Sequence, residues 1–104
     1  PYGEYLVDCY LNSINIEYEK ERKLKDLKDK NCLRFDFAVY NNNNFGLIEH
    51  DGSYHNKTNC LHTDNIEKHD RMKDEYCKDN NIPLLRIETY TDIEEKVGKF
   101  VRNL

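Results

Sequence analysis

The chain has 104 residues, of which 38% are hydrophobic and 35% are charged, and its formal net charge at pH 7 is -4. This length supports one domain around a single modest core. No apolar run reaches the roughly 20 residues that a membrane helix requires, so the composition excludes a membrane-spanning protein as well as a disordered one. Because the chain begins at Pro1, without an initiator methionine or a secretion signal, we expect it to be a domain excised from a longer polypeptide.

The four cysteines, Cys9, Cys32, Cys60 and Cys77, do not follow the Cys-x-x-Cys spacing of redox and metal motifs. Three of them fall in apolar patterns that suit small buried side chains. We therefore predict free thiols in a reducing, intracellular compartment, either the cytoplasm or the nucleus of a host cell.

The chain opens with a predicted helix over residues 3–12, where apolar residues recur at helical spacing. A strand-like stretch over residues 14–18 leads into a basic segment, which we expect to be a connection or the frayed end of that strand. The segment has two interpretations: its cations face phosphate groups, or it is a solvated loop in which Asp26 and Asp29 balance the lysines. Its cations are Lys20, Arg22, Lys23, Lys25, Lys28 and Lys30.

Two acidic side chains interrupt apolar runs that otherwise predict buried strands. The runs cover residues 33–40 and 45–50, and the Asn-rich turn 41–44 joins them. A buried carboxylate is costly unless a partner stabilises its charge. We expect the two strands to hold Asp36 and Glu49 side by side at the edge of one sheet, where a divalent cation can bridge them.

A polar, irregular loop is predicted over residues 52–62. Asp64 with Glu67 three residues later is a helix-start signal, and the helix is expected to continue to about Lys78. On this helix two charged residues share a stripe with two apolar ones, which turns charge toward the protein interior. The residues of the stripe are Ile66, Asp70, Lys73 and Cys77.

The chain ends with a short apolar strand over residues 84–87 and a closing helix, for which Thr91 and Glu94 form a capping-box pattern. The order of elements is therefore helix, three strands, helix, strand, helix. This order predicts an α/β domain in which helices flank a central mixed sheet of four strands.

Several short motifs follow one another along these elements: Glu4, Arg34-Phe35-Asp36-Phe37, Ile48-Glu49-His50-Asp51-Gly52 with His55, Asp70-Arg71 with Lys73, and Leu84-Leu85-Arg86-Ile87. Their order and spacing resemble the PD-(D/E)XK, or restriction-endonuclease-like, nuclease superfamily. Within it the chain is similar to the branch that includes very-short-patch mismatch repair endonucleases and related phage or viral proteins. The resemblance implies an αβββαβ core with an extra C-terminal helix, and the activity of a divalent-metal-dependent endodeoxyribonuclease.

The chain departs from the superfamily pattern at one position. A lysine usually follows the second strand carboxylate by two residues, but Asp51 stands two residues after Glu49. In the mismatch-repair-like branch, other polar residues complete the site. The resemblance therefore adds Asp51, His55, Asp70 and Lys73 to the catalytic candidates Asp36 and Glu49.

The resemblance also implies a cofactor, Mg²⁺ or Mn²⁺, held by carboxylates. Asp36 and Glu49 are the first candidate ligands, with Glu4 or Asp51 in support, because Mg²⁺ keeps several waters and needs only one or two protein carboxylates. Lys73 would orient a water or neutralise developing charge, and His55 would act as an acid–base group. The expected partner is DNA, with RNA left open, and no membrane. The candidate nucleic-acid contacts are Lys20, Arg22, Lys23, Arg34 and Arg71.

Each candidate also has a purely structural interpretation. Asp36 could pair with Arg34 or Arg86 at a strand edge, and Asp51 could simply form an Asp-Gly turn. Two further interpretations are helical, namely a dipole-complementing first-turn carboxylate at Glu4 and an i,i+3 pair between Asp70 and Lys73.

Two other functions stay open. The missing strand lysine is also expected in a catalytically inactive nuclease-like module that binds nucleic acid or a protein partner. A zinc-stabilised structural domain is the second alternative, because four potential zinc ligands lie within a short stretch, although none has a strong finger spacing. These residues are His55, Cys60, His62 and His69.

Overall fold

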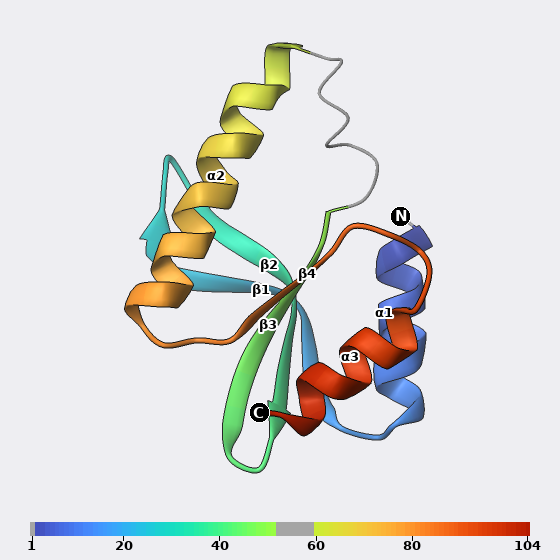
Figure 1. Cartoon of the computed structure of the whole chain (residues 1–104). Coiled ribbons are helices and arrows are strands. Elements are labelled where there is room, and N and C mark those ends of the chain that lie inside the picture. Colours follow the sequence, from blue (N-terminus) through green and yellow to red (C-terminus); the bar gives the residue numbers. More distant parts are fainter. Residues whose placement is uncertain (1, 52–59) are drawn as a thin grey trace.

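The computed structural model describes residues 2–51 and 60–104, and the side chains of the second range from residue 66 onward. The order of elements is the predicted one, and four strands form one mixed sheet in the order β1-β2-β3-β4 (Figure 1). The pairs β1–β2 and β2–β3 are antiparallel, whereas β3 and β4 are parallel. The elements are α1 (Tyr2–Ser13), β1 (Glu17–Lys28), β2 (Cys32–Asn41), β3 (Asn44–His50), α2 (Cys60–Asp79), β4 (Leu84–Ile87) and α3 (Ile93–Arg102).

Helices cover both faces of the sheet: α1 and α3 lie on one side and α2 on the other (Figure 1). Each side has its own hydrophobic core, as expected for a sheet that is buried on both faces. The core under α1 and α3 is built around Val7, Leu11, Phe37, Val39, Ile48, Ile87, Ile93, Val97 and Val101. The core under α2 is built around Leu24, Leu27, Leu33, Phe35, Ala38, Leu47 and Cys77.

The turn between β2 and β3 confirms the prediction from the asparagine run. Asn42 and Asn43 have φ angles of 54° and 66°. A two-residue hairpin turn of this kind needs positive φ at both positions, and asparagine tolerates that conformation better than most residues. The turn sets the register in which Phe37 pairs with Ile48, and so places the two acidic positions opposite each other.

Of the two structures expected for the basic segment, a connection or the end of a strand, the second holds, because the segment as far as Lys28 is part of β1. This strand begins at Glu17 rather than near residue 14, and it runs on to Lys28 beside β2, with a register shift between Lys23 and Lys28. The shift turns both Leu24 and Leu27 into the core under α2, which breaks the two-residue alternation that normally reveals a strand. Charged residues elsewhere on β1 suit its place at the edge of the sheet.

Both predicted helix starts are corrected. Helix α2 begins at Cys60, earlier than Asp64, so residues 60–62 of the predicted loop are helical, and residues 52–59 lie outside the described part of the chain. Helix α3 has Asp92 rather than Thr91 at its N-cap, with φ of 58° and no side-chain capping bond. The carboxylates of Glu94 and Glu95 in its first turn still complement the helix dipole.

Three cysteines with described side chains, Cys9, Cys32 and Cys77, are free thiols, as predicted. No helix in residues 2–51 and 60–104 combines the length and apolar character needed to cross a bilayer.

Candidate functional site

The side chains of β2 change faces of the sheet at Asp36. Phe35 packs in the core under α2, whereas Phe37 packs in the core under α1 and α3. Side chains two residues apart on a regular strand share one face, so the backbone must rotate between them. The register of β2 and β3 ends at the pair of Phe37 with Ile48, while β3 stays paired with β4 as far as His50. Strand β2 therefore separates from β3 at Asp36, and we call this point of the sheet the fork.

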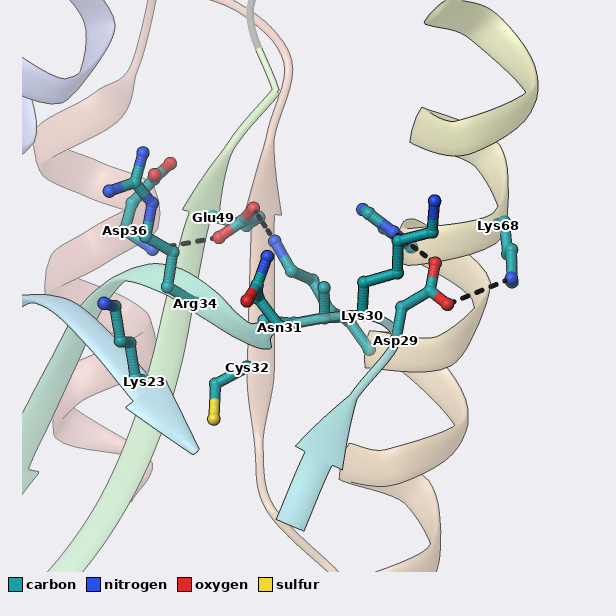
Figure 2. Close-up of a pocket in the computed structure, with 12 residues that line it drawn as sticks. Lys23, Asp29, Lys30, Asn31, Cys32, Arg34, Asp36, Glu49 and Lys68 are labelled. Carbon is teal, nitrogen blue, oxygen red and sulfur yellow. Dashed lines mark hydrogen bonds and ion pairs between the residues drawn. The ribbon is translucent and has the colours of Figure 1, made fainter. Parts of the chain in front are cut away.

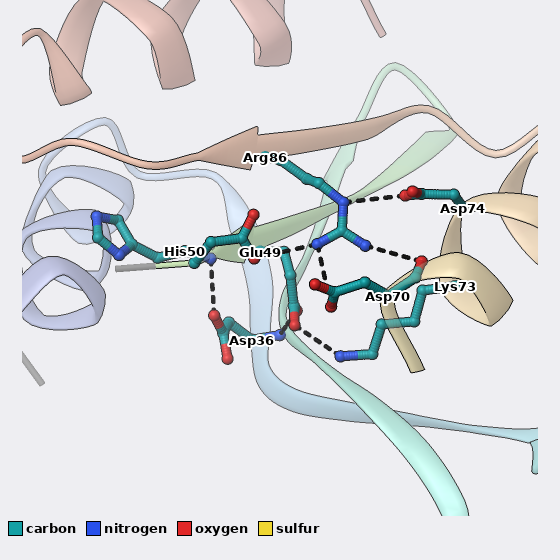
Figure 3. A network of polar contacts seen from close by, with 8 residues as sticks. Asp36, Glu49, His50, Asp70, Lys73, Asp74 and Arg86 are labelled. Atoms are coloured by element: carbon teal, nitrogen blue, oxygen red, sulfur yellow. Dashed lines mark hydrogen bonds and ion pairs between the residues drawn. The ribbon is translucent and has the colours of Figure 1, made fainter. Parts of the chain in front are cut away.

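The two strand carboxylates occupy this fork and replace backbone partners across it (Figure 3). The Asp36 N–H donates to Glu49 Oε2 at 2.9 Å, and the His50 N–H donates to Asp36 Oδ2 at 2.8 Å. Each carboxylate thus satisfies an amide of the other strand. Asp36 and Glu49 therefore lie side by side, as predicted from their positions in the two apolar runs. The contribution of the His50 amide has no signal in the sequence.

Lys73 reaches the same fork from α2. Its Nζ lies 2.6 Å from Glu49 Oε1, and both side chains are only 11% exposed. The ammonium also lies 5.2 Å from the centre of the Phe35 ring, within the range of a cation–π contact. Burial raises the pKa of Glu49, and the charge of Asp36 adds to this, while Lys73 works in the opposite direction. The helix therefore places an ammonium group beside Glu49.

Glu4 approaches Asp36 from α1, and the two residues line one cavity of about 220 Å³. The pKa of Asp36 is raised to about 6, chiefly by burial, and also by the charge of Glu4 and a hydrogen bond with it. The His50 N–H and Lys73 oppose this shift. Two carboxyl groups held this close repel each other when both are ionised, which a cation between them relieves.

Gly3 sets how closely α1 approaches the fork. A Cβ atom at this position would overlap the ring of His50, so only glycine allows the contact. The Nε2 atom of His50 also lies 3.0 Å from the carbonyl oxygen of Thr89, which anchors the ring. Glu4 follows Gly3 directly, so this contact determines where the Glu4 carboxyl lies.

We predict that Gly3→Ala moves the first turn of α1 away from His50. The expected result is a melting temperature lower by several degrees, because an overlap at a buried contact costs about 1–3 kcal/mol. The pKa of Asp36 should fall toward its ordinary value as Glu4 retreats. Carbon-detected NMR titration of the Asp36 carboxyl measures this, and an unchanged titration would show that Gly3 does not position Glu4.

Two other predicted carboxylates, Asp51 and Asp70, contact Arg86 and form a separate cluster beside the fork (Figure 3). The Nη1 of Arg86 lies 3.0 Å from Asp51 Oδ1, its Nε lies 2.9 Å from Asp74 Oδ1, and its Nη2 donates to the Asp70 carbonyl oxygen at 3.2 Å. Asp70 Oδ1 is also 3.5 Å from Nη1. Asp51 and Asp70 thus tie β3 and α2 to β4 through Arg86, and they do not join Asp36.

The structural interpretation of Asp36 as an arginine-paired strand residue does not hold. Arg86 contacts the cluster just described, and Arg34 forms an ion pair with Glu21 at 3.1 Å. The partners of Asp36 are the amide of His50 and the carboxyl of Glu4.

Two of the predicted nucleic-acid contacts on β1 pair with acidic neighbours. Lys20 Nζ lies 3.3 Å from Asp8, and Arg22 lies 3.0 Å from Glu19. These ion pairs are exposed and contribute little to stability, so they compete weakly with a phosphate. Lys20 still lines the smaller cavity with Asp36.

A larger cavity of about 810 Å³ opens on the α2 side of the fork (Figure 2). It extends from Asp36 and Glu49 to the tip between β1 and β2, and it includes Lys23 and Arg34 among the predicted contacts. Arg71 is exposed on α2. The cations that line the cavity are Lys23, Lys30, Arg34, Lys68 and Lys73.

His69, a candidate zinc ligand, bonds instead to Asp29, with its Nε2 3.0 Å from Asp29 Oδ2. The other three zinc candidates, His55, Cys60 and His62, lie outside the described side chains, and so does the acid–base role expected of His55. No pattern in the sequence predicts the contact between His69 and Asp29, because 40 residues separate the two positions.

The fork offers a metal ion only a few protein ligands, so waters would complete its coordination. Within residues 2–51 and the described side chains of 66–104, no three histidine, cysteine or acidic residues form a ready metal cluster. Mg²⁺ needs only one or two protein carboxylates and keeps its remaining waters. Asp36 and Glu4 are hard oxygen donors at close quarters, and the pKa of Asp36 is raised mainly by burial and also by the charge of Glu4, which a cation would offset. The residues fit Mg²⁺ or Mn²⁺.

No family model, curated protein or solved structure matches this chain.

Proposed function

We propose that the chain is a divalent-metal-dependent endonuclease of the PD-(D/E)XK superfamily that hydrolyses phosphodiester bonds in DNA. One observation carries the proposal: the forked sheet brings Asp36 and Glu49 together on neighbouring strands, and α2 adds Lys73 to them. A structural ion pair would require neither the like-charged contact of Asp36 with Glu4 nor the pKa of about 6. Perturbed carboxyl groups that line a cavity are typical of functional sites.

The mechanism assigns a task to each side chain. Asp36 and Glu4 would hold Mg²⁺ or Mn²⁺, with Glu49 beside them, and the bound ion supplies charge neutralisation and an acidified water. Glu49, whose pKa is raised by burial, accepts a proton from water more readily near neutral pH than an ordinary carboxylate. The ammonium of Lys73 has three hydrogens, of which the bond to Glu49 uses one, so it can also donate to a phosphate oxygen or a water.

The test is nicking of supercoiled plasmid DNA by the purified protein. Cleavage is expected with Mg²⁺ or Mn²⁺ and not with EDTA, and a labelled RNA of the same sequence tests the second polymer. Binding of Mn²⁺, followed by its electron paramagnetic resonance signal, is an independent measurement. Cleavage that persists in EDTA would contradict the metal-dependent mechanism.

We predict that Glu49→Gln abolishes detectable nicking and preserves the fold. Glutamine keeps an oxygen that can accept the Asp36 N–H, but its NH2 group then faces the Lys73 ammonium, so we expect the variant to fold with lower stability than the wild type. The loss of the charge removes the proton acceptor, with an expected drop of about 100-fold or more in rate. Matched far-ultraviolet circular dichroism spectra establish that the variant is folded, and activity equal to the wild type would remove Glu49 from the mechanism.

The alternative of an inactive, nucleic-acid-binding module has one observation in its favour. Both oxygens of Glu49 already accept hydrogen bonds, one from Lys73 and one from the Asp36 amide. Retention of labelled DNA without cleavage in Mg²⁺, Mn²⁺ or Co²⁺ would establish this alternative. Nicking in any of these ions establishes the enzyme.

A further inference from the structure

We propose that Lys68 and His69 form a binding subsite for a backbone phosphate of the nucleic acid, and that the carboxylate of Asp29 occupies this subsite in the free protein. The inference rests on the proposed function, because it names the part of the substrate that the larger cavity binds. It assigns to these three residues a role in binding that is separate from the cleavage chemistry at Asp36.

The geometry at Asp29 is that of an anion held by two donors (Figure 2). Lys68 Nζ lies 3.3 Å from Asp29 Oδ1, and His69 Nε2 lies 3.0 Å from Asp29 Oδ2. The two donors are neighbours on α2, and each binds a different oxygen of one carboxylate. Two nonbridging phosphate oxygens present acceptors in a similar way. The pKa of Asp29 is lowered by its hydrogen bonds to His69 and Lys68, so the carboxylate is ionised.

The subsite belongs to the same cavity as the fork. Asp29, Lys68 and His69 line that cavity together with Asp36 and Glu49. Lys30, next to Asp29, lines it as well. A nucleic-acid strand whose scissile phosphate lies at Asp36 can therefore place another of its phosphates beside α2 within the same cavity.

A phosphate can displace Asp29 at little cost. The side chain of Lys68 is 50% exposed and that of Asp29 is 28% exposed. Exposed ion pairs contribute about 0–1 kcal/mol, so opening this contact hardly destabilises the protein. The Lys68 ammonium carries three hydrogens and the contact uses one, so it can already meet a phosphate before Asp29 leaves. Binding of the polyanion then also releases its counterions.

The first experiment compares Asp29→Asn with Asp26→Asn. Both changes remove one negative charge near the end of β1, but Asp26 bonds to the Tyr76 hydroxyl at 2.7 Å and does not line the cavity. Affinity for a fluorescein-labelled 20-mer DNA is measured by anisotropy, with Asp36→Asn added to both proteins to prevent cleavage. We expect Asp29→Asn to bind up to about fivefold more tightly than Asp26→Asn. Equal affinities would overturn the proposal.

The second experiment removes a donor. Lys68→Gln should weaken binding and lower the slope of log K against log salt by about one phosphate contact, whereas Lys78→Gln, at the far end of α2, should leave the slope unchanged. In the double variant Asp29→Asn/Lys68→Gln, the gain from Asp29→Asn should disappear. An unchanged slope in Lys68→Gln would also overturn the proposal.

The outcome is separable from that of the proposed function. If the wild type nicks plasmid and Asp29→Asn binds no better than Asp26→Asn, the subsite is wrong and the nuclease stands. If no ion supports cleavage but the binding differences appear, the subsite stands on a module that only binds nucleic acid.

Discussion

Replacing Asp36 by asparagine is expected to abolish DNA cleavage and, at pH 7.5, to make the metal-free protein more stable. The carboxylate is partly buried beside Glu4, so its charge is unfavourable without a cation, and its pKa is raised to about 6. Asparagine keeps an oxygen that can accept the His50 N–H. A raised pKa corresponds to about 1.4 kcal/mol per unit, which solvent screening reduces, so we expect a gain of about 1 kcal/mol, or about 5 °C.

The sign of the pH dependence follows from the direction of the shift. The folded protein binds the Asp36 proton more tightly than the unfolded chain. The stability that this proton contributes is therefore fully present below the ordinary pKa of 3.8 and is lost as the pH rises through about 6. Asparagine does not titrate, so the stability of the variant does not fall in this way as the pH rises. The difference in free energy of unfolding between variant and wild type should therefore grow between pH 4 and pH 6 and then stay constant. Urea titrations across this range measure it.

Asp8 provides the matched control. Its pKa is lowered by the hydrogen bond from Tyr18 and by Lys20, so Asp8→Asn should lose stability at neutral pH, the opposite sign. If Asp36→Asn is instead destabilising at pH 7.5, the carboxyl groups at the fork do not repel each other. If it still nicks plasmid at the wild-type rate, the proposed metal site is excluded.

Lys73→Met is the second change for which we expect a large effect. It leaves Glu49 buried without the ammonium that now lies 2.6 Å away. Breaking such a pair is expected to cost about 3 kcal/mol at pH 7.5, the low end for buried pairs, because Glu49 can take up a proton instead. Its pKa should rise further, and the stability difference from the wild type should shrink as the pH falls toward 4. Cleavage, measured well below the melting temperature, should slow about 100-fold.

The control for Lys73→Met is Lys78→Met, which removes a charge from the exposed end of the same helix. It should change neither stability by more than about 0.5 kcal/mol nor the cleavage rate. Binding of Mn²⁺ should survive in Lys73→Met, because the carboxylates remain. A folded Lys73→Met protein that cleaves at the wild-type rate would confine Lys73 to a structural role.

Much of the architecture was predictable because it depends on local patterns. The asparagine turn, the apolar strands beside it and the helical stripe of Lys73 are all visible within short windows of sequence. The first strand was expected, but its length was underestimated, because the register shift near its end breaks the alternation. The start of α3 was misplaced because Asp92 adopts a positive φ and the capping bond expected of Thr91 does not form.

The residues of the candidate site also fall into those that local sequence patterns predict and those that only distant contacts bring together. Acidic residues inside apolar strands mark Asp36 and Glu49 whatever their surroundings, because an unpaired buried carboxylate is too costly to occur without a reason. Which of the other carboxylates join them depends on contacts between distant segments. Arg86 draws Asp51 and Asp70 away from Asp36, and nothing in a short window of sequence indicates this.

The amino-acid sequence by itself determined the order of elements and the two strand positions where carboxylates meet, because hydrophobic periodicity and turn chemistry act between near neighbours. Only the tertiary structure decided the fork at Asp36, the approach of Glu4 and Lys73 to it, and the contact of Asp29 with α2. Those features arise where helices dock on opposite faces of one sheet, and the packing that sets their positions involves residues far apart in the chain.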